Sequence, residues 1–169
     1  MTNVDNLIGN SKKMIDILGN SYEYNCLGCE IASKKITPPG GIIYEDETFI
    51  LASDPEVPLK GFLIVNVKRH INSVTELSID EQHRMIEIVS KAINVLKDLN
   101  ITKEVTLVQE ERSKHFHMWI FPHQDWMIEK FGKGISYLRD ICKYVQENVT
   151  DKELNEVMET IELIKNAYK

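Results

Sequence analysis

The stretch from Lys114 to His123 constrains the fold of this chain most, because it reads as a buried strand that carries two histidines. A strand places alternate side chains on the same face. One face is then wholly apolar: Phe116, Met118 and Ile120. His115 and His117 share the other face, about 7 Å apart along the chain. Two imidazoles at this spacing indicate a nucleophile, an acid–base group or metal ligands. The structural alternative is one hydrogen-bonded imidazole and one exposed at a sheet edge.

The composition sets the class of protein to which this strand belongs. The chain has 169 residues, of which 43% are hydrophobic and 27% charged, typical of one soluble domain, here with a small helical appendage. A net charge of −6 without a basic block disfavours nucleic-acid binding as the main function. No apolar run has the length of a transmembrane helix, and the polar segment 1–10 does not resemble a signal peptide. We therefore expect a cytoplasmic protein with no membrane partner.

Two of the three cysteines, Cys26 and Cys29, form a CxxC pair, and Cys142 lies far from them. An odd number of cysteines in a reducing compartment does not indicate a disulfide framework. The pair fits a zinc knuckle, a redox pair or two unbonded core thiols. No thioredoxin-like βαβ pattern surrounds it, which disfavours the redox alternative. Cys142 falls on an apolar helical stripe and is interpreted as a small core residue.

The remaining patterns predict a mixture of strands and helices. Alternating or continuous apolar runs bounded by turn residues predict strands at 42–45, 49–52, 61–67, 104–109 and 116–121. Helical periodicity, in two cases behind a capping box, predicts a helix and linker over 1–25, a long helix over 78–99, further helix after residue 122, and a last helix over 150–168.

Four potential metal ligands come from separate parts of this pattern. A tetrahedral zinc site needs four nitrogen or sulfur ligands. Cys26, Cys29, His70 and His115 can supply them, from one loop and the ends of two strands. His117 then remains beside the metal on the same strand, free for chemistry. The metal would fasten the N-terminal CxxC segment to the strand that carries the nucleophile.

A set of motifs runs through the chain in a fixed order. The first three are Cys26-Leu-Gly-Cys29, Ile42-Ile-Tyr-Glu-Asp46, and Asp54 together with the segment 58–61. The next three are the segment 62–70, which ends in His70, the pair Leu77-Ser78, and the histidine-containing segment 115–122. In order and spacing these resemble the histidine triad (HIT) family, in its zinc-containing branch. The resemblance implies an α+β fold, with a central antiparallel sheet of about five strands, one long packed helix and usually a homodimer. It divides the chain into an N-terminal helix or linker (1–21), a HIT-like domain (22–125) and a C-terminal helical extension (126–169).

The resemblance also implies roles for single residues. His117 would attack the α-phosphorus of a nucleotide and form a covalent nucleotidyl-histidine, while zinc would be structural. Asp54 would bind the ribose hydroxyls. Apolar residues near Ile43 would sandwich the base. Gln109 and Ser113 would form hydrogen bonds with phosphate oxygens.

One position departs from the family pattern. The family has HxHxHxx, and Trp119 stands where the third histidine would be. In hydrolase members that histidine contacts phosphate and protonates the leaving group, whereas a tryptophan N–H can donate but cannot transfer a proton. The uridylyltransferase branch has glutamine there, so the nucleophile can work without a third histidine. His123, just after Pro122, is the candidate for assisting the leaving group.

Three functions remain open on this basis. The leading hypothesis is a nucleotide hydrolase acting on a dinucleoside polyphosphate, such as diadenosine tetraphosphate, or on a nucleoside phosphoramidate. The second is a nucleotidyl transferase of the galactose-phosphate uridylyltransferase type. The third is a nucleotide-binding protein without catalysis.

Overall fold

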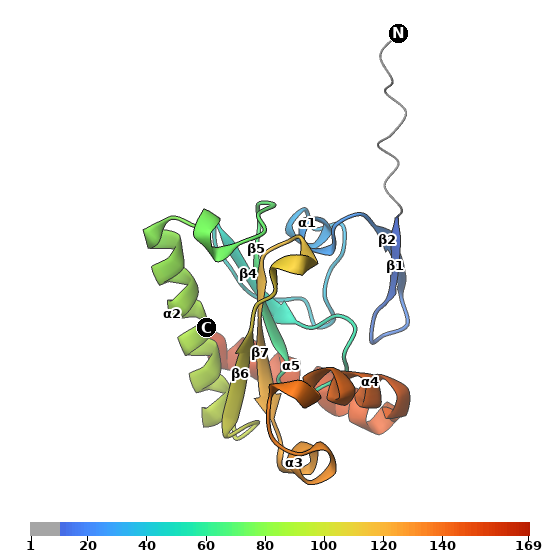
Figure 1. Cartoon of the computed structure of the whole chain (residues 1–169). Coiled ribbons are helices and arrows are strands. Elements are labelled where there is room, and N and C mark those ends of the chain that lie inside the picture. The colour runs from blue at the N-terminus through green and yellow to red at the C-terminus, as the bar shows by residue number, and fades with distance from the viewer. Residues whose placement is uncertain (1–10) are drawn as a thin grey trace.

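A computed structural model describes residues 11–169 of the chain, and its centre is an antiparallel sheet in the order β3-β4-β5-β7-β6 (Figure 1). The strands are β1 (Lys12–Ile15), β2 (Ser21–Tyr24), β3 (Ile42–Glu45), β4 (Phe49–Ser53), β5 (Leu63–Val67), β6 (Glu104–Val108) and β7 (His117–His123). The helices are α1 (Leu27–Ala32), α2 (Ile79–Asp98), α3 (Asp125–Phe131), α4 (Leu138–Asn148) and α5 (Asp151–Tyr168). The expected α+β class and five-stranded sheet are confirmed. Over residues 11–169, none of the helices combines the length and the apolar character needed to cross a membrane.

The long helix α2 covers one face of the sheet (Figure 1). It begins at a capping box, in which Ser78 accepts from the backbone N–H of Glu81 and the Glu81 carboxylate accepts from the backbone N–H of Ser78. Its apolar side packs on fully buried strand residues such as Leu51, Val65 and Ile120. Burying one such side chain stabilises the fold by roughly 1.5–3 kcal/mol. Because this layer buries more apolar side chains than the other clusters, it is the main core.

The opposite face carries a row of different side chains. The register pairs Ile50 with Asn66, and Asn66 with His117. Paired residues of an antiparallel sheet share a face. Trp119, paired with Ile64, lies in the next row on the same face. The short helix α1 packs against β5 on this side, so its residues can reach the His117 row.

The helix expected over the first 25 residues is wrong where the structure describes it. Residues 12–24 form the hairpin β1–β2 instead. Its turn is built around Asp16, whose carboxylate accepts two backbone N–H bonds, and Gly19, which has a φ of +84°. An aspartate and a left-handed glycine favour a turn over a continuing helix. The expected helix over residues 1–10 lies outside the described residues.

The C-terminal helices pack on both faces of the sheet. Helix α5 contacts α2 and β3, and Gly40 permits this because a Cβ there would lie 2.4 Å from Ile161 Cγ2. Helix α4 joins a second core on the His117 side, together with Phe62, Phe121 and the partly buried Trp119. Cys142 is buried in that core, as the apolar stripe predicted.

Candidate functional site

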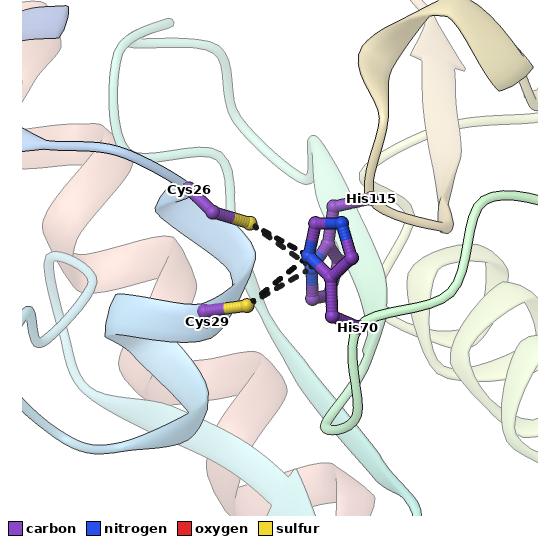
Figure 2. Close-up of side chains that lie close together, drawn as sticks. All are labelled: Cys26, Cys29, His70 and His115. Atoms are coloured by element: carbon purple, nitrogen blue, oxygen red, sulfur yellow. Dashed lines mark hydrogen bonds between the residues drawn. The ribbon is translucent and has the colours of Figure 1, made fainter. Parts of the chain in front are cut away.

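The four predicted metal ligands lie together at one end of the sheet. Cys26 caps the N-terminus of α1, Cys29 lies in its first turn, and the two imidazoles of His70 and His115 face them (Figure 2). The Cys26 sulfur lies 3.4 Å from Nδ1 of His70 and 3.2 Å from Nδ1 of His115. The Cys29 sulfur lies 3.3 Å and 3.6 Å from the same two atoms. The two Nδ1 atoms are 3.3 Å apart.

These distances fit one tetrahedral zinc ion. Zinc bonds of about 2.3 Å to sulfur and about 2.0–2.1 Å to nitrogen place sulfur and nitrogen about 3.5 Å apart, and two nitrogens about 3.3 Å apart. All four ligand atoms lie within 4.8 Å of one another. The donor set, two thiolates and two imidazoles with no open position, is that of a structural zinc site rather than a catalytic one.

The protonation of the thiols depends on whether a metal is bound. Burial and the neighbouring Cys26 raise the pKa of Cys29 to about 11. The Cys29 thiol therefore stays protonated at neutral pH without a metal. Zinc deprotonates its thiol ligands outright and so reverses this effect.

His115 is held in the tautomer that a metal requires. It is only 4% exposed, and burial lowers its pKa, so the neutral ring is favoured. Its Nε2 lies 2.8 Å from the carbonyl oxygen of Val67, which can only accept, so Nε2 carries the hydrogen. Nδ1 then presents its lone pair to the two sulfurs. A backbone carbonyl behind a metal-binding histidine is a common supporting contact.

Two residues that support the cluster were missed from the sequence. A Cβ at Gly28 would lie 2.3 Å from Cδ2 of His115, so only glycine lets α1 approach the ring. The buried Asn66 donates from Nδ2 to the carbonyl of Gly28 at 3.1 Å. The sequence did contain a signal for Asn66: it is the one polar residue in the otherwise apolar strand β5, where a buried amide needs a hydrogen-bond partner.

His117 is oriented by the same backbone segment. Its Nδ1 lies 2.9 Å from the carbonyl oxygen of His115 and must donate to it. A neutral ring with the hydrogen on Nδ1 leaves the Nε2 lone pair free. His117 is partly exposed on the sheet face opposite α2, so this nitrogen can act as a nucleophile toward a bound substrate.

The two polar residues expected at the phosphate differ in their contacts. The Oγ of Ser113 lies 2.9 Å from the carbonyl of Glu110 and 3.0 Å from that of His115. Its single hydrogen is directed to these carbonyls, so the predicted bond to phosphate would require the hydroxyl hydrogen to turn away from both. Gln109 is the opposite case. Among residues 11–169, its Nε2 is the one buried side-chain nitrogen or oxygen without a hydrogen-bond partner.

Asp54 lies at the end of β4 and is 7% exposed. Its Oδ1 accepts the backbone N–H groups of Glu56 and Val57, both at 2.8 Å, and so shapes the loop that follows. Burial raises the pKa of Asp54 to about 7 despite these two bonds. The predicted contact with ribose is therefore left to the second carboxylate oxygen.

Ile43 does not lie on the sheet face that carries His117. It belongs to the main core under α2, because it is the strand neighbour of Ile42 and neighbouring strand residues point to opposite faces. Ile42 pairs with Ala52 and packs in the cluster on the His117 side. Of the apolar residues near Ile43, Ile42 is therefore one that lies on the His117 side.

His123 is too far away to assist the leaving group. It lies six residues beyond His117 on the same strand, which corresponds to roughly 20 Å. Its Nε2 is 2.6 Å from Oγ1 of Thr106 on β6. The prediction that His123 replaces the third histidine is therefore wrong.

Trp119 is half-buried next to His117 on the same strand face. Its ring meets Phe62 edge-on at 5.1 Å between centroids. The guanidinium of Arg139, from α4, lies 5.9 Å from the ring centre. This arginine also escaped the sequence-based prediction, because nothing in its local pattern links it to β7.

Comparison with known sequences identifies the family. The HIT domain matches residues 37–126, which is more than half of the chain and includes His70, His115 and His117. The chain belongs to the HIT domain family. The cysteines of the metal cluster lie before the matched segment.

Individual HIT proteins resemble the chain over most of its length. An uncharacterized HIT-like protein from Methanocaldococcus jannaschii is 31% identical over 115 residues, covering 64% of this chain and 88% of that protein. The protein named hit from Bacillus subtilis is 28% identical over 116 residues, covering 65% of this chain and 74% of that protein.

Solved structures of HIT proteins share the fold. A zinc-bound histidine triad family protein from Mycobacterium smegmatis matches with a TM-score of 0.60 at 16% identity, over 85% of this chain and 93% of that one. A Hit-like protein involved in cell-cycle regulation from Bartonella henselae matches with a TM-score of 0.59 at 19% identity, over 86% of this chain and 98% of that one. At these identities the likeness concerns the fold.

Proposed function

We propose that this HIT protein is a nucleotide hydrolase that works through a nucleotidyl-histidine on His117. The observation that carries the proposal is the hydrogen bond from Nδ1 of His117 to the His115 carbonyl, because it leaves Nε2 as the free nucleophile. In the first step Nε2 bonds to the α-phosphorus and the bond to the leaving group breaks. In the second step water attacks phosphorus, the P–N bond breaks, and a nucleoside monophosphate leaves.

Other contacts support a bound nucleotide. The unpartnered Nε2 of Gln109 would be satisfied by a phosphate oxygen, since a buried N–H without an acceptor is costly. Gln109 directly follows Val108, which pairs with Trp119, two residues from His117. Asp54 would use its second oxygen for the ribose hydroxyls. Ile42, in place of Ile43, would lie against the base.

Zinc is proposed as the ion in the Cys26–Cys29–His70–His115 cluster. It would fasten α1 to the segment that precedes His117, and so hold the His115 carbonyl that orients the nucleophile. Its contribution would be structural, because all four of its positions are taken by protein ligands. The zinc-bound protein from Mycobacterium smegmatis supports this choice of metal for the fold.

The chain is also proposed to form a homodimer, as the family resemblance implies. Strand β6 is an edge strand of the sheet, and its Leu107 side chain is 42% exposed. Ile79 and Ile86 on α2 are exposed as well. An unpaired edge and exposed apolar side chains favour association with a second copy. Sedimentation analysis of the wild type and of Leu107→Lys would test this: a wild-type monomer contradicts it.

Trapping of the intermediate tests the catalytic proposal. The protein is mixed with a nucleoside triphosphate or a dinucleoside polyphosphate, and intact mass is measured at neutral pH, where a P–N bond survives. We expect a mass increase of one nucleotidyl group that is absent from His117→Ala. Turnover of any nucleotide by His117→Ala at the wild-type rate would refute the role of His117.

The same assay separates the alternatives. Transfer to an added sugar phosphate in preference to water would favour the nucleotidyl transferase. Tight nucleotide binding without a covalent adduct would favour the non-catalytic alternative, which Trp119 supports because it cannot transfer a proton.

A further inference from the structure

Arg139 reaches the His117 face of the sheet from the C-terminal helix α4. Its guanidinium carbon lies 5.9 Å from the centre of the Trp119 ring. Its Nη2 lies 2.8 Å from Oε2 of Glu110, in the segment between β6 and β7. Since Trp119 follows His117 by two residues on one strand face, the arginine lies over the ring nearest to the proposed nucleophile on that face.

Glu110 brings a second cation to the same place. Nη2 of Arg112 lies 2.9 Å from its Oε1. Val108 pairs with Trp119, so the ladder continued by two positions would bring Glu110 level with His117. Hydrogen bonds from the two arginines, with that from Arg112 the stronger influence, hold the pKa of the Glu110 carboxyl below its usual value. One carboxylate thus faces two guanidinium groups.

The stability of α4 does not explain this arginine. Arg139 lies in the first helical turn, where the positive end of the helix dipole disfavours a cation. Helix α4 also has no side-chain N-cap, whereas α2 and α5 begin with capping boxes. The Arg139 side chain is 65% exposed, so its ion pair with Glu110 is weakly stabilising.

We propose that Arg139 binds the leaving-group phosphates of a nucleoside or dinucleoside polyphosphate, and that it stabilises their charge where Trp119 offers no transferable proton. The inference rests on the function proposed for His117. When Nε2 of His117 bonds to the α-phosphorus, the bond to the bridging oxygen breaks and its electron pair stays on the departing polyphosphate. Arginine stabilises that charge by N–H donation and keeps its own proton. A nucleoside phosphoramidate is disfavoured, since its amine must gain a proton to leave.

The geometry leaves Arg139 able to do this. A guanidinium has five N–H donors in one plane, and the contact with Glu110 uses only part of them. The Trp119 ring would hold the plane in a fixed orientation by stacking. Lysine at position 139 would keep the charge but lose the planar fork.

Binding measurements with Arg139→Gln test the proposal directly. The ligands are adenosine monophosphate and α,β-methylene adenosine triphosphate, with the guanosine pair in parallel, at one ionic strength. We expect the triphosphate Kd to rise by about tenfold or more and the monophosphate Kd by less than about threefold. Lys143→Gln is the matched control, because it removes a cation one turn further along the same helix. Both variants should unfold at the wild-type temperature, and Arg139→Lys should restore only part of the triphosphate affinity.

Turnover provides the second readout. We expect Arg139→Gln to lower kcat/KM about 100-fold for a dinucleoside polyphosphate and less than about threefold for a nucleoside 4-nitrophenyl phosphate, whose leaving group carries no phosphate. Equal losses for both substrates, or an unchanged ratio of the triphosphate and monophosphate affinities, would overturn the inference.

The two proposals can fail separately. A nucleotidyl adduct on His117 together with an unchanged affinity ratio in Arg139→Gln would remove the role of Arg139 and leave the proposed function intact. A changed ratio without any adduct would support Arg139 as a polyphosphate ligand and refute catalysis by His117. If the wild type binds neither nucleotide, both proposals are wrong.

Discussion

Replacing Gly28 by alanine should damage the metal cluster, although alanine is the better helix former. Gly28 lies inside α1, where helix propensity alone predicts a gain of about 1 kcal/mol for Gly28→Ala. The structure predicts the opposite sign. The new Cβ would lie 2.3 Å, 2.5 Å and 2.6 Å from Cδ2, Nε2 and Cγ of His115.

The size of the effect follows from these contacts. Carbon atoms rest about 3.5–4.0 Å apart, so α1 or the His115 ring must move by more than about 1 Å. Zinc sites tolerate only about 0.2 Å in their ligand distances. A shift of this size should raise the zinc Kd by about 10–100-fold, or about 1.4–2.8 kcal/mol. With the strain of overpacking added, we expect the zinc-bound protein to lose about 2–4 kcal/mol of unfolding free energy.

Three measurements check this prediction. They are elemental analysis of freshly purified protein, titration against a chromophoric zinc chelator, and urea unfolding with and without a strong chelator. Gly19→Ala is the matched control, since Gly19 has nothing within 4 Å of its Cβ position. With a φ of +84°, this control should cost about 1 kcal/mol without any change in zinc affinity. Wild-type zinc affinity in Gly28→Ala, or a gain in its stability, would refute the steric reasoning.

Three further predictions concern the same face of the sheet. Cys26→Ser should lose zinc and unfolding free energy, while the protein that remains folded keeps its covalent adduct on His117, as mass spectrometry would detect. Because the folded pKa of Asp54 is about 7 and its ordinary value is 3.8, the folded state holds the extra proton, and wild-type stability should fall as pH rises from about 4 to about 7. Asp54→Asn should remove this fall, worth about 2–4 kcal/mol between pH 5 and pH 8 in urea unfolding. Trp119→His should raise kcat/KM for a nucleoside phosphoramidate by about tenfold or more, because it supplies a proton to the amine.

Each of these has a result that would contradict it. Full zinc content in Cys26→Ser would remove that thiol from the ligand set. A pH dependence in Asp54→Asn equal to that of the wild type would mean that Asp54 titrates normally. An unchanged phosphoramidate rate in Trp119→His would show that proton supply at this position does not limit the reaction.

The sequence was most informative where chemistry or periodicity is local. Cys26 and Cys29 are separated by one helical turn, so their convergence follows from their spacing. The alternation along β7 predicted a buried strand, and the Ser78 capping box predicted the start of α2. The four-ligand cluster could also be foreseen, because few other residues in the chain offer nitrogen or sulfur ligands.

The predictions that failed depend on distance and on packing. His123 follows His117 closely in sequence, but an extended strand carries it roughly 20 Å away. Ile43 points into the core and its neighbour Ile42 to the His117 side, since one position along a strand reverses the face of a residue. The N-terminal helix became a hairpin because the Asp16 turn outweighs a weak apolar periodicity.

The amino-acid sequence by itself predicted the Cys26–Cys29–His70–His115 cluster, the His117 position and the strands that carry the histidines, since each depends on residue type and short-range spacing. Only the tertiary structure decided what surrounds them. Gly28 matters because α1 meets His115 from 87 residues away in the chain. Arg139 matters because α4 folds back over Trp119. Such contacts arise from packing between distant segments, and no local pattern encodes them.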